Sequence, residues 1–193
     1  MAQVVKKRKT AETDIELALD LCGGTVDIQT GVGFFDHMLT AFAVHAGYGL
    51  TVRCRGDLHV DAHHTVEDVG IVLGQALAQS VGDKSAIARY GTFYIPMDEA
   101  LAFVCVDISG RAYLHYEAEL KQEKTGDFDT CLAVEFFRAL ANQAGLTLHV
   151  RCLYGENAHH QLEAMFKAVG HALAQATAPR QGGVLSTKGS LES

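Results

Sequence analysis

The chain lacks the segments that would carry it into or across a membrane. None of its apolar runs approaches the roughly 20 residues that span a bilayer. No apolar segment precedes a small-residue cleavage site near the charged N-terminus, so we expect no secretory signal. Proline is scarce, with two among 193 residues, and the five cysteines form no Cys-x-x-Cys pair. An odd number of cysteines without such pairs indicates reduced thiols in a cytoplasmic protein.

Positive charge is also in short supply. The 16 Lys and Arg residues face 23 Asp and Glu residues, for a formal net charge of −7. Affinity for a nucleic-acid backbone depends on clustered Lys and Arg, and only residues 6–9 form a basic run, which is more typical of a solvated edge. The hydrophobic fraction of 48% excludes disorder. We therefore expect one soluble globular domain, or two very small ones, that binds neither nucleic acid nor membrane.

One sequence pattern occurs twice in the chain. Three pairs of segments match in the same order: residues 12–23 with 99–110, 46–54 with 144–152, and 63–67 with 159–163. The first pair is offset by 87 residues and the second by 98, which places an 11-residue insertion in the second copy. Shared composition does not explain a repeated His-His-x-x-Glu and Val-Arg-Cys. We predict an internal duplication with a first half at residues 1–88, a second half at 89–178 and a Gly/Ser-rich C-terminal tail at 179–193.

Each copy has the hydrophobic periodicity of an α+β unit. Partly alternating apolar runs that end in Gly predict strands, and apolar residues spaced by three and four predict amphipathic helices. The predicted strands are residues 15–21, 26–29, 50–54, 101–108, 113–120 and 146–153, and the predicted helices are residues 34–44, 64–81, 128–143 and 160–176. Turns at residues 23–24 and 109–110 predict a hairpin between the first two strands of each copy. Each copy thus has the order β-β-α-β-α, and the two halves must bury their apolar faces against each other.

Side chains that can bind metal recur at equivalent positions of the two copies. On a helix, Glu67 lies on the same face as His63 and His64, whose imidazoles diverge by roughly 100°. This divergence suits two ions better than one. The offset of 98 also aligns Glu135 with His37. The predicted metal ligands are five imidazoles and three carboxylates: His37, His63, His64, Glu67, Glu135, His159, His160 and Glu163.

The donor types narrow the metals that this set could hold. Imidazole and carboxylate without thiolate favour Mn, Fe, Zn or Ni over Ca or Mg. Eight side chains are too many for one tetrahedral zinc, so we expect two ions with three or four protein ligands each. The residues alone leave open two alternatives: a solvated helix start at each His-His-x-x-Glu motif, and metals with a purely structural or subunit-linking role.

A second group of polar residues is typical of a phosphate site. Arg89 follows the first unit, Arg111 follows Ser109-Gly110, and residues 186–189 are Ser-Thr-Lys-Gly in the tail, which we expect to be ordered only if something binds it. Guanidinium forks, an ammonium and hydroxyls suit a phosphate monoester. Taken singly, these features are more typical of a surface arginine and of a simple tail.

Several long and unusual motifs run through nearly the whole chain. They are Arg-Lys-Thr-Ala-Glu-Thr at 8–13, Thr-Gly-Val-Gly-Phe-Phe-Asp-His-Met-Leu at 30–39, Asp-Ala-His-His-Thr-Val-Glu-Asp at 61–68, Pro-Met-Asp-Glu-Ala-Leu at 96–101, Asp-Ile-Ser-Gly-Arg at 107–111, Asn-Ala-His-His at 157–160 and Ser-Thr-Lys-Gly at 186–189. With these motifs the sequence resembles the imidazoleglycerol-phosphate dehydratase family, the lyases of histidine biosynthesis.

The resemblance implies a fold, a cofactor and an assembly. It implies duplicated α+β halves packed with helices between two mainly antiparallel or mixed sheets. It also implies two Mn²⁺ ions per active site, held by the His and Glu positions given above. The implied assembly is a homo-oligomer of 24 subunits with active sites shared between subunits. In two places the chain departs from the family: Glu135 stands where relatives usually have His, and His171 where they usually have Arg. A carboxylate at position 135 adds negative charge and a harder ligand.

The resemblance further implies the reaction, which is dehydration of D-erythro-imidazoleglycerol phosphate to imidazole acetol phosphate. The substrate imidazole, bound between two ions, would become imidazolate and expel a hydroxyl through a diazafulvene-like intermediate. Glu12 is the candidate for proton transfer, and Glu67 and Glu163 complete the catalytic carboxylates. The implied substrate-binding residues are Glu12, His37, His45, His63, Glu67, Arg89, Arg111, Ser186, Thr187 and Lys188.

Three alternatives remain at this point. His45, about two helical turns after His37, is as consistent with a core histidine as with a substrate contact. A binuclear metallohydrolase acting on a small phosphate ester would use the same ligands to generate hydroxide. A non-catalytic metal-binding assembly protein would need the metals but no phosphate site.

Overall fold

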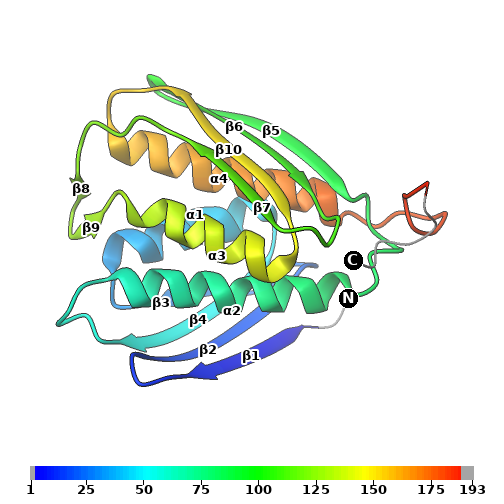
Figure 1. The fold of residues 1–193 in the computed structure, drawn as a ribbon, viewed down its shortest axis with the longest axis horizontal. Helices are drawn as coiled ribbons and strands as arrows, with labels where there is room; N and C mark the ends of the chain where they lie inside the picture. The colour runs from blue at the N-terminus through cyan, green and yellow to red at the C-terminus, as the bar shows by residue number, and fades with distance from the viewer. Residues whose placement is uncertain (1–2, 188–193) are drawn as a thin grey trace.

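Two four-stranded sheets lie on opposite sides of a set of helices, and each sheet comes from one half of the sequence (Figure 1). The computed structural model describes residues 3–187. The first half contains β1 (Val4–Lys9), β2 (Thr13–Asp20), β3 (Val26–Gln29), α1 (Gly33–Ala46), β4 (Gly49–Gly56) and α2 (His63–Val81). The second half contains β5 (Tyr90–Met97), β6 (Ala100–Asp107), β7 (Tyr113–Glu117), α3 (Leu132–Ala144), β10 (Thr147–Tyr154) and α4 (Ala158–Thr177). A small hairpin, β8 (Lys124–Thr125) with β9 (Phe128–Asp129), lies between β7 and α3.

The two sheets share one topology. The strand order is β1-β2-β4-β3 in the first sheet and β5-β6-β10-β7 in the second. In the first sheet β1–β2 and β2–β4 are antiparallel and β3–β4 is parallel, and the second sheet repeats this arrangement. The mixed sheets, the helices between them and the repeated order confirm the predicted α+β fold with its internal duplication.

Each copy begins with a strand that the sequence does not predict, so its order is β-β-β-α-β-α, with the small β8–β9 hairpin added in the second copy. The hydrophobic periodicity does not reveal β1 and β5, because only one residue in each of these edge strands is fully buried. On β1, Lys7 forms an ion pair with Glu16 at 2.8 Å and Lys9 with Asp14 at 2.8 Å. In the basic run at residues 6–9, Lys7 and Lys9 are thus exposed, whereas Arg8 is partly buried and pairs with the buried Asp68. Charged edges of this kind discourage pairing with other strands.

The predicted hairpins at residues 23–24 and 109–110 are wrong. In each copy the third strand pairs in parallel with the strand that follows the next helix, as β3 does with β4 through α1. Parallel neighbours need such a crossover connection. The link from β2 to β3 consequently passes over the start of β4, where a Cβ on Gly49 would lie 2.8 Å from the carbonyl oxygen of Gly23. The glycines mark this close crossing instead of a tight hairpin turn.

The helices lie close to their predicted positions. α1, α2 and α4 begin and end within two residues of the predicted bounds. The predicted helix at residues 128–143 instead begins at Leu132, because Phe128 belongs to β9. Phe128 is fully buried, so its apolar character continues the periodic pattern without being helical. Within residues 3–187, none of the helices combines the length and the hydropathy that a membrane span requires.

The core lies between the sheets, where helices pair across the two halves. α1 packs on α4, and α2 packs on α3. Glycines permit these close crossings: a Cβ on Gly170 of α4 would lie 2.5 Å from the carbonyl oxygen of Phe42 of α1. In the same way a Cβ on Gly70 of α2 would lie 2.8 Å from the carbonyl oxygen of Phe136 of α3. Phe35 of α1 packs edge-on against Phe136 at 5.4 Å, which joins the two helix pairs.

The described part of the C-terminal tail is bound to the connection between the halves. Three backbone hydrogen bonds join this connection to the end of α4 and the start of the tail: Ala88 N to Ala178 O at 2.9 Å, Arg89 N to Ala176 O at 2.8 Å, and Arg180 N to Ala86 O at 2.9 Å. An isolated bridge between Ile87 and Pro179 continues the same pairing. These contacts within the chain hold the start of the tail beside the segment that leads into β5.

Replacing Gly170 with Ala should destabilise the protein, because the new methyl group would force α1 and α4 apart. We expect the free energy of unfolding to fall by about 2 kcal/mol, measured by denaturant or thermal melts. Gly33→Ala is the matched control, since a Cβ at Gly33 meets no atom within 4 Å, and its effect should stay within about 0.5 kcal/mol. Equal stabilities of the two variants would contradict the close crossing.

Candidate metal centre and active site

Three of the predicted ligands meet where α1 crosses α4. His37 Nε2 lies 3.3 Å from Glu163 Oε2, and His159 Nε2 lies 3.1 Å from the same oxygen. One ligand atom from each of these three residues lies within 4.8 Å of the other two. Among residues 3–187, these are the three residues whose ligand atoms come this close together. Two imidazole nitrogens and a carboxylate oxygen form a donor set that Mn, Fe, Zn and Ni accept. The group therefore fits a transition-metal ion and takes residues from both halves.

The start of α4 sets the geometry of this group. Asn157 caps the helix, and its side-chain oxygen accepts a hydrogen bond from the His159 backbone N–H at 2.9 Å. Glu163 follows His159 by four residues, so the two side chains share one helix face. The Phe34 ring packs edge-on against the His159 ring at 5.1 Å. A cap, the helical repeat and an aromatic contact together orient the His159 imidazole toward Glu163.

Lys167 adds a positive charge beside the group, and the sequence analysis does not identify it. Its Nζ lies 2.7 Å from Glu163 Oε1, one helical turn further along α4. Burial acts to raise the pKa of Glu163, but the hydrogen bond and charge of Lys167, helped by His37, keep that pKa below its ordinary value. Glu163 is therefore a carboxylate, with its second oxygen directed at the two histidines. The spacing of four residues between Glu163 and Lys167 was the available sequence signal.

The equivalent residues of the first half are more open. His63 and Glu67 lie 3.5 Å apart on one face of α2, and both are about half exposed. Glu135 lies on α3, where its carboxylate pairs with Arg138 one turn away. Within the described residues no ion pair joins Glu135 to His63 or Glu67. The duplication thus repeats the residue types. Among the described residues, however, only the ligands on α1 and α4 come together in a compact group.

The second histidine of each pair points away from the first and contacts carboxylates. The ring planes of adjacent histidines are inclined at 77° in the first copy and 79° in the second, with centroids 6.2 Å apart in both. His64 Nδ1 lies 3.0 Å from Asp57 Oδ2, and its Nε2 lies 3.7 Å from Glu12 Oε1. The hydrogen bond with Asp57 raises the pKa of His64. His63 and His64 thus contact different carboxylates.

The second copy repeats this arrangement with other residues. His160 Nδ1 lies 2.8 Å from Glu99 Oε2, and its Nε2 lies 3.8 Å from Asp98 Oδ2. The hydrogen bond from His160, with those from the backbone N–H groups of Asn157 and Glu156, lowers the pKa of Glu99 to about 2. A carboxylate on Nδ1 fixes the ring and leaves Nε2 as the ligand atom, which is the common support for a metal-ligating histidine.

Asp57 and Glu99 are thus site residues that the sequence analysis missed. One signal was available for Glu99, because the repeat aligns residues 12–23 with 99–110 and so aligns Glu99 with Glu12. Asp57 follows β4 in a loop, and no periodic pattern marks it.

His45 lies further along α1, beside a histidine of α4. Its Nδ1 is 3.0 Å from His171 Nε2, and Phe93 stacks on the His171 ring at a centroid distance of 4.2 Å. Burial lowers the pKa of both imidazoles, and for His45 the charges of His171 and Lys167 lower it further. The pair is therefore neutral near pH 7, with one ring donating to the other.

The β5–β6 turn lies at one end of the second sheet. The predicted phosphate-binding residues lie at the other end of this sheet. Arg89 is buried, contacts Asp107 and donates to the Leu185 carbonyl oxygen. Arg111 is exposed, and its backbone N–H donates to Ser109 Oγ at 3.3 Å. Ser186 and Thr187 end the described tail, while Lys188 lies outside the described residues.

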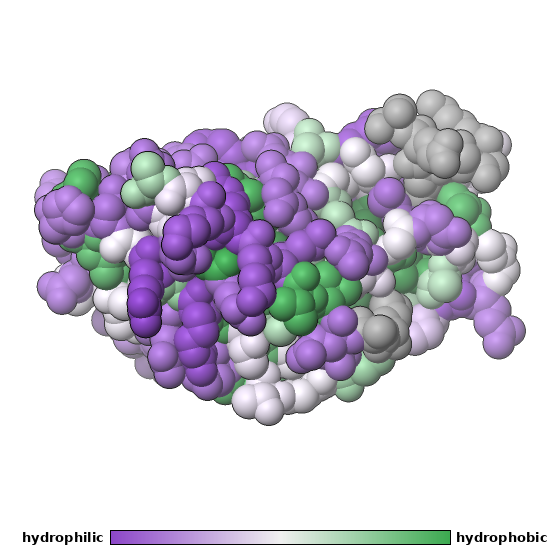
Figure 2. Space-filling model, turned by 90° about the horizontal axis from the view of Figure 1, so that it is seen from below, coloured by the Kyte–Doolittle hydropathy of each residue, from purple (hydrophilic) through white to green (hydrophobic). Residues whose placement is uncertain are grey.

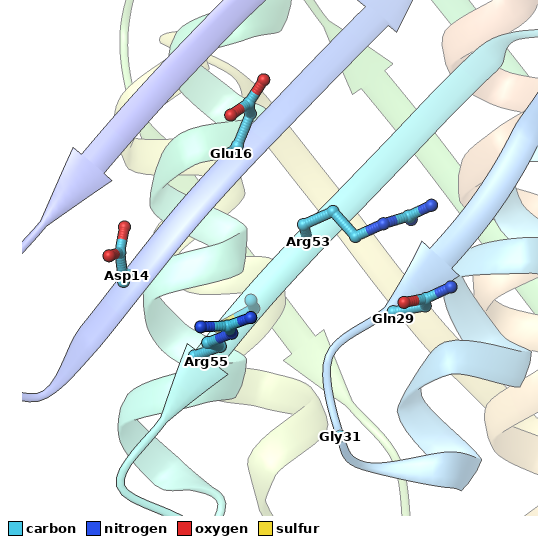
Figure 3. Close-up of a pocket in the computed structure, with 7 residues that line it drawn as sticks. Asp14, Glu16, Gln29, Gly31, Arg53 and Arg55 are labelled. Carbon is cyan, nitrogen blue, oxygen red and sulfur yellow. The ribbon is translucent and has the colours of Figure 1, made fainter.

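An open depression of about 400 Å³ lies on the outer face of the first sheet. Figure 2 views this face, which hydrophilic side chains largely cover, and in Figure 3 Asp14 and Glu16 project from β2 and two arginines from β4. Its lining residues are Asp14, Glu16, Gln29, Gly31, Arg53, Cys54 and Arg55. None of the predicted site residues lines it, and its two carboxylates pair with lysines of β1. The depression therefore lies apart from the predicted site residues.

The fold and the site define a duplicated α+β protein with a His/Glu group suited to a transition-metal ion. The chain belongs to the imidazoleglycerol-phosphate dehydratase family, whose model matches residues 30–173. This finding confirms the family that the sequence motifs indicate.

Curated relatives and solved structures of the same name cover nearly the whole chain. The imidazoleglycerol-phosphate dehydratase of Acetivibrio thermocellus is 59% identical over 187 residues, which cover 95% of this chain and 96% of that protein. The one of Bacillus cereus strain G9842 is 56% identical over 194 residues and covers 99% of this chain and 100% of its own. The crystal structure from Staphylococcus aureus subsp. aureus N315 superposes with a TM-score of 0.85 at 45% identity and covers 93% of this chain and 100% of its own. The Pyrococcus furiosus structure, in complex with (S)-C348, has a TM-score of 0.86 at 39% identity and covers 96% of this chain and 99% of its own.

Glu99→Gln should weaken metal binding, because the neutral amide holds the His160 ring less firmly. We expect the affinity for Mn²⁺, titrated calorimetrically into chelator-treated protein, to fall about tenfold. Glu117→Gln is the matched control, since Glu117 pairs with Arg151 on the exposed face of β7 and should leave the affinity unchanged. Unaltered affinity in Glu99→Gln would contradict the supporting role of Glu99.

Proposed function

We propose that the chain dehydrates D-erythro-imidazoleglycerol phosphate to imidazole acetol phosphate, the lyase step that its family performs in histidine biosynthesis. The observation that carries this proposal is the group of His37, His159 and Glu163 in a chain of this family. The substrate contains an imidazole ring, which is itself a metal ligand. A centre built from imidazoles and carboxylates can therefore accept the substrate ring as a further ligand.

We assign two Mn²⁺ ions to each active site and eight residues as their ligands. The proposed ligands are His37, His63, His64, Glu67, Glu135, His159, His160 and Glu163. When bound, the ions supply Lewis acidity that lowers the pKa of the substrate imidazole N–H and holds the ring in place. We further propose that neighbouring copies complete these sites in a 24-subunit homo-oligomer, because within residues 3–187 only three of the eight proposed ligands form a compact group in a single chain.

Both halves of the chain contribute to this proposed centre. Residues 1–88 supply four of the ligands and residues 89–178 supply the other four. We take these ranges as the two units of the duplication, and residues 179–193 as a tail that contributes to phosphate binding. We propose that the reaction takes place in the cytoplasm.

Glu12 is the residue that we assign to proton transfer. It lies in the exposed turn between β1 and β2, with Oε1 3.7 Å from His64 Nε2. The proton that the substrate loses lies beside a hydroxyl and not beside a carbonyl, so no enolate stabilises direct abstraction. The ring electrons expel the hydroxyl on the attached carbon, and Glu12 takes the neighbouring proton. The enol that results becomes the ketone of the product.

The remaining carboxylates and histidines orient the substrate. Glu67 and Glu163 keep the ligand geometry, and the buried Glu163 is held in place by Lys167. His37 and His63 lie at the edge of the proposed substrate site. His45 is assigned to the same site because it lies on the α1–α4 crossing beside His171.

The phosphate is assigned to positive and hydroxyl groups near the C-terminal end of α4, away from His159, so a neighbouring copy would bring them to a given metal centre. These are Arg89, Arg111, Ser186, Thr187 and Lys188. Arg89 and the tail are already joined through the Leu185 carbonyl oxygen, which supports a shared role. Two guanidinium groups and an ammonium match the charge of a phosphate monoester.

The decisive experiment incubates manganese-loaded protein with imidazoleglycerol phosphate and follows imidazole acetol phosphate. Formation of this product supports the dehydratase. The alternative, a binuclear metallohydrolase acting on a small phosphate ester, predicts release of inorganic phosphate and no ketone. Chelator-treated protein serves as the control and should be inactive until Mn²⁺ is restored.

Glu163→Gln should lower metal content and turnover together, because both His37 Nε2 and His159 Nε2 contact Glu163 Oε2. We expect at least about a tenfold fall in Mn²⁺ affinity, measured by metal analysis after dialysis, with a parallel loss of kcat. Glu117→Gln is again the matched control. Full metal retention in Glu163→Gln would remove Glu163 from the ligand set.

Glu12→Gln should lower kcat by about 100-fold or more while metal content stays unchanged, because an amide cannot accept the substrate proton. Steady-state rates and metal analysis on the same preparation separate this effect from loss of metal. A variant with normal kcat would show that another group moves the proton.

A further inference from the structure

The contacts of Arg89 indicate a role for Asp107, an acidic residue outside the metal centre and outside the predicted site residues. Arg89 is 7% exposed and connects the two halves just before β5. Its φ of 77° lies in the left-handed region, which is uncommon for a residue other than glycine and costs about 1 kcal/mol or more. Three backbone hydrogen bonds from neighbouring segments enclose it: Arg89 N to Ala176 O at 2.8 Å, Ala88 N to Ala178 O at 2.9 Å, and Ile108 N to Arg89 O at 3.0 Å. The surrounding chain thus maintains a strained backbone at this one arginine.

Asp107, the last residue of β6, holds the Arg89 guanidinium from one side. Arg89 Nε donates to Asp107 Oδ1 at 2.6 Å, and Nη2 donates to Oδ2 at 3.0 Å. Paired contacts of this kind fix the plane of the guanidinium as well as its position. The face of the Tyr90 ring, 4.7 Å from the guanidinium carbon, restricts it further.

The opposite edge of the same guanidinium holds the tail. Arg89 Nη1 donates to the carbonyl oxygen of Leu185, and the Ser186 backbone N–H donates to the Val184 carbonyl oxygen at 2.9 Å in a tight turn. Leu185 directly precedes the two hydroxyl residues that we assign to the phosphate. A guanidinium has five N–H donors, and these contacts use three of them. The two terminal nitrogens carry one further N–H each, next to the start of the Ser-Thr segment.

We propose that Asp107 is a positioning residue for the substrate phosphate. It orients Arg89, which in turn fixes the Leu185 carbonyl and with it the next two residues of the tail. Asp107 does not itself meet the phosphate, because a carboxylate would repel it. This inference rests on the proposed function, since it assumes that Arg89 and the tail bind the phosphate of the substrate.

Asp107→Asn tests the inference in the full-length, manganese-loaded enzyme. The amide keeps the size of the side chain but accepts only one of the two hydrogen bonds and loses the charge. We expect KM for imidazoleglycerol phosphate to rise about tenfold, with kcat changed by less than about twofold. Inhibition by inorganic phosphate should weaken by the same factor, whereas inhibition by phosphate-free imidazoleglycerol should not change. Asp27→Asn, which breaks an exposed pair with Arg53, is the matched control and should change none of these values.

A double-mutant cycle separates positioning of the tail from a general structural role. Ser186→Ala alone should raise KM. Combined with Asp107→Asn it should raise KM by less than the product of the two single effects, because both changes act on the same contact with the phosphate. A combined effect equal to that product overturns the proposal.

The other outcomes are equally decisive. An unchanged KM in Asp107→Asn, or a fall in kcat at constant KM, overturns the inference. If that variant does not fold, Asp107→Glu keeps the charge but displaces the carboxylate, and it should raise KM without altering inhibition by imidazoleglycerol. If neither variant folds, Asp107 is a structural residue and the inference is wrong. An unaltered enzyme that forms no ketone product overturns the proposed function itself, before any variant is compared.

Discussion

The crossing of α1 over α4 is the contact on which the rest of the structure depends. Each half of the chain is a sheet covered on one face by two helices, and alone it would leave those helices without a partner on their other side. The absence of a side chain at Gly170 brings the two backbones close enough for the halves to share one core. The same crossing places His37 of the first half against Glu163 of the second. The packing of α1 on α4 therefore builds the shared core and also brings the ligands together.

Carboxylates at the loops then determine which way the histidines face. Asp57 and Glu99 accept hydrogen bonds from the Nδ1 atoms of His64 and His160, and both lie outside the helices that carry the imidazoles. Their charges fix the rings through Nδ1 and leave Nε2 as the ligand atom. Helix α4 alone cannot provide this, because a helical repeat sets the direction of a Cα–Cβ bond but not the rotation of a ring. The turn between β5 and β6 thus takes part in the site through a residue with no predicted ligand role.

Hydrophobic periodicity located the helices and the inner strands, because these elements bury one regular face. It failed for the edge strands β1 and β5, in each of which only one residue is fully buried, and for the pairing of β3 and β7. A glycine pair between two strands suits a hairpin when only the local sequence is considered. Parallel pairing across α1 is decided by contacts that the chain makes only after the helix has folded back. In the second copy the apolar pattern likewise extends beyond the helix to Phe128, which is buried in a strand and not in a helix.

The sequence by itself determined that the chain is duplicated, that its halves are α+β units, and which residue types carry its chemistry. Matching segments and their spacing are properties of the chain, so they can be read without coordinates. Only the tertiary structure decided that His37, His159 and Glu163 meet while Glu135 pairs with Arg138, although the alignment treats the two copies as equivalent. It also decided that Arg89 joins Asp107 to the tail. Such contacts depend on distances between segments far apart in the chain, and packing of the two halves sets those distances.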